Sequence, residues 1–278
     1  MYINVKGQLV DLRQARVMGI LNLTPDSFFE DSRRKTEEEI LSRVGQLRRE
    51  GADFIDVGAY SSRPGAAFVS EEEERRRLDF GLPVLFGEYP EAVVSVDTFR
   101  SRIARYCVEQ YGVAMINDIS AGELDKDMFS TVADLRVPYI MMHMRGTPQE
   151  MARLTVYENF TEEVFMYFAR KKYELTRLGV NDIIVDPGFG FSKNLEQNYR
   201  LMAILEEFQM LELPLLVGIS RKKMIREVLD CTTDESLNGT TVLHVYSLLK
   251  GANILRVHDV KEAVQAIKLI EKIKNSHL

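Results

Sequence analysis

The sequence predicts an α/β fold of the (β/α)8 class, a TIM barrel with an N-terminal β-hairpin. Three observations support this prediction. Short apolar runs recur eight times along the 278 residues, each run ends in polar or glycine residues, and the stretches between the runs carry apolar residues at helical spacing. Alternation of strand and helix is typical of a parallel sheet surrounded by helices, and about 250 residues is a common length for one barrel. We therefore expect residues 1–278 to form a single domain.

The eight predicted strands are the apolar runs, which cover residues 16–22, 54–58, 92–97, 114–118, 138–143, 182–188, 213–220 and 252–258. Residues 2–11 precede the first run and have Lys6 and Gly7 at their centre, a pair that favours a tight turn. We expect this segment to form a hairpin that covers the bottom of the barrel.

Capping residues predict where several helices begin. Three pairs place a capping side chain three residues before an acidic or amide partner, namely Thr36 with Glu39, Ser70 with Glu73, and Asn194 with Gln197. The run 71–77 consists of glutamates followed by arginines, and opposite charges at i,i+4 spacing predict a solvated helix face without a catalytic role. Apolar residues at positions 243, 245, 248 and 249 predict a helix between the seventh and eighth strands.

Composition limits the classes of function and partner. The net charge of −6 argues against nucleic acid or an anionic membrane surface as the main partner. An anionic small substrate would then need a local basic pocket. The two cysteines, Cys107 and Cys231, cannot by themselves form a disulfide framework or a metal cluster, and they fit a reducing compartment. No apolar run is long enough to span a membrane, so we expect a cytoplasmic protein.

Chemistry in a (β/α)8 barrel is located at the carboxyl ends of the strands. The polar and charged residues at those ends are Asn22, Ser61, Asp97, Asn117, His143, Asp186, Ser220, Lys222, Arg256 and His258. We therefore expect the catalytic and substrate-binding residues to be among these.

Hydrogen-bond acceptors end three different predicted strands. Asp97, Asn117 and Asp186 would face one cavity inside an apolar barrel, where an unpaired carboxylate is costly. A heterocycle with an exocyclic amine and ring N–H groups would supply the missing donors, at about 1.5–3 kcal/mol for each charge-assisted hydrogen bond. Phe191 and Lys222 follow neighbouring strands and would add an aromatic wall and a cationic donor. This group predicts a site for a flat heterocycle.

Basic residues end other strands and predict a site for an anion. Arg63, Lys222, Arg256 and His258 meet at one rim if the barrel closes, and there they could hold a phosphate or pyrophosphate group. Asn22 could add an amide oxygen to Mg²⁺, a cation that prefers oxygen ligands, keeps several waters and commonly shares the phosphates of a substrate. We therefore expect Mg²⁺ as the cofactor.

Eight motifs lie at or near the predicted strand ends. They read MGILNLTPDSF at 18–28, SSRPGA at 61–66, SVDT at 95–98, INDI at 116–119, MHM at 142–144, DPGFGF at 186–191, GISRK at 218–222 and RVHD at 256–259. Together these motifs resemble those of the dihydropteroate synthase family, the pterin-binding barrels of the folate pathway. The resemblance covers the chain from about residue 16 to its end, in the order of the family.

The resemblance implies condensation of 6-hydroxymethyl-7,8-dihydropterin pyrophosphate with 4-aminobenzoate, in which the C–O bond to pyrophosphate ionises before the amine attacks. It implies a homodimer and Asn22 as a ligand of Mg²⁺. The catalytic residues that it implies are Asp97, Asp186, Lys222, Arg256 and His258. The substrate-binding residues that it implies are Ser62, Arg63, Pro64, Asp97, Asn117, Ile119, Met142, Asp186, Phe191, Gly218, Lys222 and Arg256.

Two departures from the family pattern leave alternatives open. Residues 29–33 replace a family Asp-Gly-Gly stretch, so either Glu30 or Asp31 could take the part of the aspartate. Lys223 stands where a small hydroxyl residue is common, and it could pair with the aminobenzoate carboxylate or point to solvent.

The alternative functions are those of a methyltetrahydrofolate-dependent methyltransferase and of a catalytically silent pterin-binding paralogue. The SRK and TPDSF motifs favour the synthase over the methyltransferase.

Overall fold

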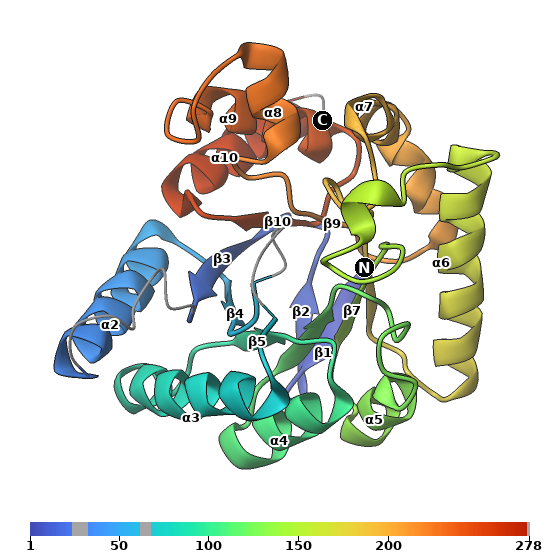
Figure 1. Ribbon diagram of the computed structural model, residues 1–278. Coiled ribbons are helices and arrows are strands. Elements are labelled where there is room, and N and C mark those ends of the chain that lie inside the picture. The colour runs from blue at the N-terminus through green and yellow to red at the C-terminus, as the bar shows by residue number, and fades with distance from the viewer. Residues whose placement is uncertain (24–32, 62–67, 277–278) are drawn as a thin grey trace.

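The computed structural model describes residues 1–23, 33–61 and 68–276, and its centre is a sheet of eight parallel strands (Figure 1). The strand order is β8-β7-β6-β5-β4-β3-β10-β9. A bridge between Val185 of β8 and Leu215, just before β9, joins the two ends of this order. The sheet therefore curls into a nearly closed barrel, and the predicted fold class is confirmed.

The strands of the barrel are β3 (Arg16–Asn22), β4 (Phe54–Gly58), β5 (Val94–Asp97), β6 (Met115–Asp118), β7 (Tyr139–Met142), β8 (Ile183–Asp186), β9 (Leu216–Val217) and β10 (Ile254–Val257). β3 and β4 have their predicted bounds. β9 is much shorter than predicted because Pro214 has no N–H to donate to a neighbouring strand, and a turn closed by Lys222 N–H and Ile219 C=O follows at once.

The helices surround the barrel and cover its outer face (Figure 1). They are α2 (Arg33–Glu50), α3 (Glu71–Glu88), α4 (Ser101–Tyr111), α5 (Met128–Leu135), α6 (Phe160–Arg177), α7 (Leu195–Ala203), α8 (Lys223–Leu229), α9 (Leu237–Leu249) and α10 (Val260–Asn275), with 3₁₀ helices η1 (Met151–Arg153) and η2 (Leu205–Leu211). α9 is the helix predicted between the last two strands, and α8 precedes it. None of the described helices has both the length and the apolar character needed to cross a membrane.

The predicted hairpin is confirmed and closes the bottom of the barrel. β1 (Tyr2–Val5) pairs antiparallel with β2 (Gln8–Asp11), and Lys6 and Gly7 both have positive φ, as a two-residue hairpin turn requires. Ile3 and Leu12 are buried in one cluster with the first residues of several strands, including Phe54, Met115 and Ile254. In Figure 1 the hairpin is seen through the ring of strands.

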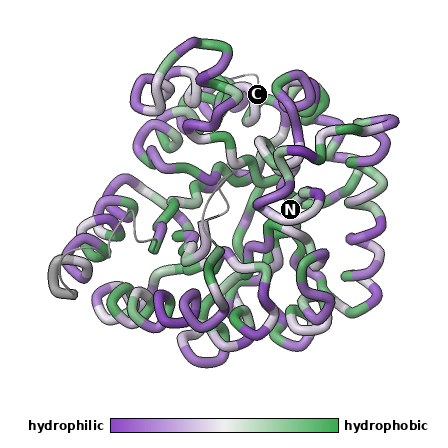
Figure 2. The backbone as a smooth tube through the Cα atoms, viewed as in Figure 1, coloured by the Kyte–Doolittle hydropathy of each residue, from purple (hydrophilic) through white to green (hydrophobic). Residues whose placement is uncertain are grey.

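Apolar side chains occupy two layers around the sheet. A large cluster fills the space between the outer face of the strands and the helices, and a smaller one fills the bottom of the barrel interior against the hairpin. In Figure 2 hydrophobic colour is concentrated along the central strands, whereas hydrophilic and hydrophobic colours alternate along the outer helices. The barrel interior near the carboxyl ends of the strands is left for polar side chains.

Two of the three predicted helix starts are confirmed. Ser70 Oγ accepts from the N–H of Glu73 at 3.2 Å, and Asn194 forms a reciprocal capping box with Gln197. The prediction for Thr36 is wrong, because α2 already begins at Arg33 and the Thr36 side chain is buried. A Thr-x-x-Glu pattern inside a helix has the same spacing as one at its start, so the local sequence does not separate the two.

The prediction of a solvated face for 71–77 is also wrong for two of its residues. Glu74 is fully buried, accepts a hydrogen bond from Thr98 Oγ1 at 2.6 Å and forms an ion pair with Arg100. Arg77 is buried as well, and its Nη1 donates to the carbonyl of Ala59 at 2.9 Å. These partners come from other elements, so the charge pattern within the helix could not reveal them.

The hairpin generates a prediction about stability. Leu12 is fully buried in the bottom layer, whereas Leu9 on the same hairpin is 74% exposed. We expect Leu12→Ala to lower the free energy of unfolding by about 2–5 kcal/mol, because it opens a cavity between hairpin and strands. Leu9→Ala, the matched control, should change it by less than about 0.5 kcal/mol. Urea unfolding followed by circular dichroism measures both, and equal losses in the two variants would contradict the role of the hairpin as a packed base.

Candidate active site

The predicted site residues that the structure describes meet at one end of the barrel, which we call the mouth. Asp97 ends β5, Asp186 ends β8, and Arg256 lies near the end of β10. In the sheet register Asp97 pairs with Asn117 of β6, and Asp186 pairs with Met142 of β7. Because all eight strands are parallel, their carboxyl ends share this level, and side chains far apart in sequence face one another there.

Arg256 crosses the barrel interior and contacts two other strands, one of which is linked in turn to a third. Its Nε donates to Asp56 Oδ2 at 2.6 Å, and its Nη2 donates to Asp97 Oδ2 at 3.0 Å. Asn117 Nδ2 donates to the same oxygen of Asp56 at 3.0 Å. Asp97, one of the three acceptors predicted to need donors, thus has a donor within the protein, whereas the amide of Asn117 itself acts as a donor here. We call Arg256, Asp56, Asp97 and Asn117 the interior network.

Asp56 is the residue of this network that sequence reasoning missed. It lies inside the apolar run of β4, is fully buried, and its Oδ1 has no hydrogen-bond partner among the residues that the structure describes. The signal was available, because a carboxylate in the middle of a strand buried on both faces requires a partner elsewhere. Burial also raises the pKa of Asp97, an effect that the Arg256 guanidinium opposes and the Asp56 carboxylate reinforces. The mouth therefore holds carboxyl groups that gain from further hydrogen-bond donors.

Asp186 and Lys222 form a second polar group at the mouth. The N–H of Gly188 donates to Asp186 Oδ1 at 2.8 Å, and Lys222 Nζ donates to the carbonyl of Phe189. Burial raises the pKa of Asp186 and lowers that of Lys222 to about 8, and in each case the opposite charge of the other residue counteracts the shift. A Cβ on Gly218 would touch both Asp186 and Arg256, so the missing side chain leaves space between the two polar groups.

One wall of the mouth is apolar. Ile119, Met142, Met144 and Met151 form a buried cluster, and Phe191 packs against it. The ammonium of Lys222 lies 4.7 Å from the centroid of the Phe191 ring. Three predicted substrate-binding residues, Ile119, Met142 and Phe191, are therefore brought together beside the charged groups. A flat ring could lie against this wall while its edges reach the polar side chains.

Asn22 ends β3 next to the interior network. A Cβ on Gly58 would lie 3.6 Å from Asn22 Oδ1 and 3.8 Å from the Cβ of Asp97, so Asn22 and Asp97 flank the same glycine. Within the described part of the chain no three or more His, Cys, Asp or Glu side chains are grouped to hold a metal ion. A cation at this point would need most of its oxygen ligands from a substrate and from water.

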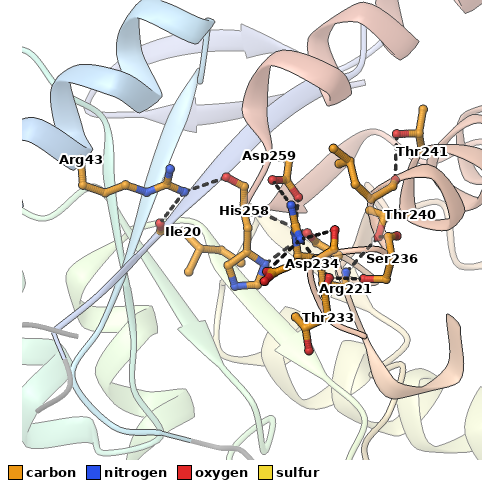
Figure 3. Close-up of polar contacts among 12 residues, drawn as sticks. Ile20, Arg43, Arg221, Thr233, Asp234, Ser236, Thr240, Thr241, His258 and Asp259 are labelled. Atoms are coloured by element: carbon orange, nitrogen blue, oxygen red, sulfur yellow. Dashed lines mark hydrogen bonds and ion pairs between the residues drawn. The ribbon is translucent and has the colours of Figure 1, made fainter. Parts of the chain in front are cut away.

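His258 and Arg221 occupy the rim between β9 and β10 (Figure 3). His258 Nδ1 lies 3.1 Å from Ser220 Oγ, and the His258 carbonyl accepts from Arg43 Nη2 at 2.7 Å. The guanidinium of Arg221 makes two hydrogen bonds to Asp259 and donates to the carbonyl of Thr233. The consecutive residues Arg221 and Lys222 thus have different roles. Arg221 anchors the loop after β9 to Asp259, and Lys222 extends to the mouth.

Comparison with known proteins decides the family. A family model described as pterin binding enzyme matches residues 18–258. The chain is 38% identical over 270 residues to the dihydropteroate synthase of Escherichia coli (strain K12), covering 96% of this chain and 94% of that protein. The chain belongs to the dihydropteroate synthase family. It is accordingly a transferase of folate biosynthesis, as the resemblance of its motifs predicts.

Solved structures of dihydropteroate synthases agree with the barrel in fold and extent. The Yersinia pestis dihydropteroate synthase with a sulfonamide drug complex has a TM-score of 0.90 and 35% identity, over 99% of this chain and 100% of that one. The Xanthomonas albilineans dihydropteroate synthase with 4-aminobenzoic acid has a TM-score of 0.90 and 34% identity, over 98% of both chains. The methyltransferase and the silent paralogue find no support in these matches.

Several residues that the dihydropteroate synthase resemblance singled out lie outside the described part of the chain. They are Ser62, Arg63 and Pro64 of the second strand-end loop, and Glu30 and Asp31 of the first. For Lys223, one of the two alternatives is supported. Its side chain is 77% exposed and pairs with Glu227 one turn along α8, so it points to solvent.

The interior network generates the second prediction. Replacing Asp56 by alanine leaves Arg256 with one carboxylate and Asn117 Nδ2 without its acceptor. Removing one partner of a buried ion pair costs about 3–5 kcal/mol, and because Asp97 still faces Arg256 we expect the lower end of that range. Asp134, exposed and paired with Arg105, is the matched control, and Asp134→Ala should leave unfolding unchanged. Thermal unfolding compares the two, and a stable Asp56→Ala protein would contradict the structural role of the network.

Proposed function

We propose that this chain condenses 6-hydroxymethyl-7,8-dihydropterin pyrophosphate with 4-aminobenzoate to give 7,8-dihydropteroate and pyrophosphate. The observation that carries the proposal is the mouth itself. Asp186 and Lys222 lie beside an apolar wall and opposite Arg256, in a chain that belongs to the dihydropteroate synthase family. A pterin is a flat heterocycle whose edges carry both donors and acceptors, and this mouth offers the complementary groups.

The pterin is expected to bind between the apolar wall and Arg256. Its exocyclic amine and ring N–H would donate to the carboxylate of Asp186. One oxygen of this carboxylate, Oδ1, already accepts a hydrogen bond from the N–H of Gly188. Lys222 would donate to an acceptor on the opposite edge, and Asp97 and Asn117 would meet the remaining polar atoms. Gly218 leaves the space that the ring needs, because a side chain there would contact both Asp186 and Arg256.

The reaction is proposed to proceed by ionisation of the methylene C–O bond before the amine of 4-aminobenzoate attacks. Arg256 and His258 would stabilise the negative charge that develops on the departing pyrophosphate, while the electron-rich pterin spreads the positive charge. Such catalysis is electrostatic and needs no nucleophilic side chain. Phe191 would border both substrates, with Ser62, Arg63 and Pro64 along the aminobenzoate.

Mg²⁺ is proposed as the cofactor, and the donor set fits it. The amide oxygen of Asn22 beside Asp97 would supply one protein ligand, and the other positions would go to phosphate oxygens and water, which is how Mg²⁺ commonly binds. When bound, the cation would neutralise charge on the pyrophosphate. Asn22 would fix that anion near the carboxyl end of β3.

A homodimer and a cytoplasmic location are further parts of the proposal. Val228 and Leu229 of α8 and Val242 and Leu249 of α9 are each more than half exposed, and α8 and α9 are neighbours, which is compatible with a covered face. Cys107 and Cys231 are both free thiols, as is usual in a reducing compartment.

A steady-state assay of pyrophosphate release tests the proposed function. The wild-type protein should release pyrophosphate only when pterin pyrophosphate, 4-aminobenzoate and Mg²⁺ are all present, and excess chelator should stop release. Asp186→Asn should lose at least about a hundredfold in kcat/KM, because an amide presents one acceptor where two donors arrive. Asp134→Ala serves as the matched control. Release without 4-aminobenzoate, or full activity in Asp186→Asn, would contradict the assignment.

The lowered pKa of Lys222 predicts how pterin binding depends on pH. Because the group loses its proton near pH 8, it is charged at pH 7 and mostly neutral at pH 9. If the charged form is the donor, the affinity for 6-hydroxymethyl-7,8-dihydropterin should fall about tenfold over that interval. Calorimetric titrations at pH 7, 8 and 9 measure this change. Lys222→Met should bind the pterin weakly at every pH. If the affinity of this variant also fell about tenfold between pH 7 and pH 9, Lys222 would be excluded as the source of the pH dependence.

A further inference from the structure

A second lysine, Lys193, is buried behind the mouth and has no part in the proposed reaction. The residue is 7% exposed, and its Nζ lies within hydrogen-bonding distance of four acceptors. These are Gly188 O at 2.9 Å, Phe191 O at 3.0 Å, His143 O at 3.3 Å and His143 Nδ1 at 2.9 Å. Lys193 therefore joins the segment after β7 to the segment after β8.

These two segments approach each other very closely at Gly188. The glycine has a positive φ of 72°, and a Cβ there would clash with the carbonyl of His143 and contact Lys193 Nζ. Two carbonyl oxygens, those of Gly188 and His143, thus point to the same small volume. Without a donor between them their dipoles would be desolvated and unpaired, which is costly in a buried place. The Lys193 Nζ supplies hydrogen bonds to both.

The carbonyl groups that accept hydrogen bonds from Lys193 belong to residues that contact or form part of the proposed pterin site. Gly188, whose carbonyl accepts from Lys193, uses its N–H to hold Asp186 Oδ1 at 2.8 Å. Phe191, whose carbonyl also accepts from Lys193, packs its ring on the apolar wall and beneath the ammonium of Lys222. One side chain thereby fixes both the carboxylate and the aromatic ring expected to contact the pterin.

The charge state of Lys193 is also affected by its burial. Burial lowers its pKa well below 10.5, and the carboxylate of Asp186 opposes that shift. Burial likewise lowers the pKa of His143, which leaves a neutral ring beside the lysine. Burying a lysine against backbone carbonyls costs free energy that an apolar side chain would not cost. The hydrogen bonds of Lys193 offset part of this cost, and they hold Gly188 and Phe191 in fixed positions.

We propose that Lys193 is a positioning residue of the pterin pocket, acting through Gly188 and Phe191 on Asp186 and on the aromatic wall. This inference rests on the proposed function. Its consequence is specific, because loss of the Lys193 hydrogen bonds should weaken pterin binding more than it weakens the fold.

The test compares Lys193→Met with Lys172→Met. Methionine keeps the unbranched apolar stem of lysine but lacks the terminal ammonium and thus its donors. Lys172 is the matched control, since its Nζ also donates to a backbone carbonyl, that of Leu211 at 2.7 Å, on the outer helices. Calorimetry with 6-hydroxymethyl-7,8-dihydropterin should show at least a tenfold higher Kd for Lys193→Met and less than a twofold change for Lys172→Met. KM for pterin pyrophosphate should rise in Lys193→Met, with kcat changing less than threefold.

A conservative variant and a double variant make the result decisive. Lys193→Gln keeps amide N–H donors and should bind with intermediate affinity. In a Phe191→Ala background, Lys193→Met should weaken binding less than it does alone, because part of its effect passes through Phe191. Wild-type affinity in Lys193→Met, equal weakening in Lys172→Met, or failure of both Lys193 variants to fold would overturn the proposal. Lack of pterin binding by the wild-type protein would instead overturn the proposed function.

Discussion

The ion pairs of Arg256 are the constraint on which the rest of the barrel interior depends. One guanidinium binds carboxylates of β4 and β5, and the first of these also accepts from Asn117 of β6. Four strands are thereby joined by side chains as well as by the sheet. Burial raises the pKa of Asp97 and of Asp186 in spite of the cations beside them, so both carboxyl groups gain from further hydrogen-bond donors. A ligand rich in N–H donors would supply them, and this is the kind of ligand proposed here.

This polar interior is possible because the stabilising apolar packing is located elsewhere. The hairpin and the first residues of the strands fill the bottom of the barrel, and the helices cover its outer face. The mouth therefore contributes little to the core and can hold charged groups at a cost in free energy. The same separation explains why glycine is used at Gly218 and Gly188, where open space and a close backbone approach matter more than packing.

Backbone carbonyls beyond β8 are held by two lysines from opposite sides. Lys222 donates to Phe189 from the mouth, and Lys193 donates to Gly188 and Phe191 from behind. The loop between them carries the aromatic wall and fixes the carboxylate of Asp186. Burial lowers the pKa of both lysines, so each has a weaker hold on its proton than a surface lysine. Preorganised donors and acceptors of this kind are what electrostatic catalysis requires.

The sequence by itself determined the barrel class, the hairpin, the bounds of β3 and β4, and the presence of Asp97, Asn117 and Asp186 at strand ends. Each of these depends on periodicity or on turn residues within a few positions, which are local properties. Only the tertiary structure decided the roles of Asp56, Glu74 and Lys193. Their partners come from distant parts of the chain, as with Arg256, which is 200 residues from Asp56. A buried charge shows in the sequence that it needs a partner, but only the closing of the barrel selects which one.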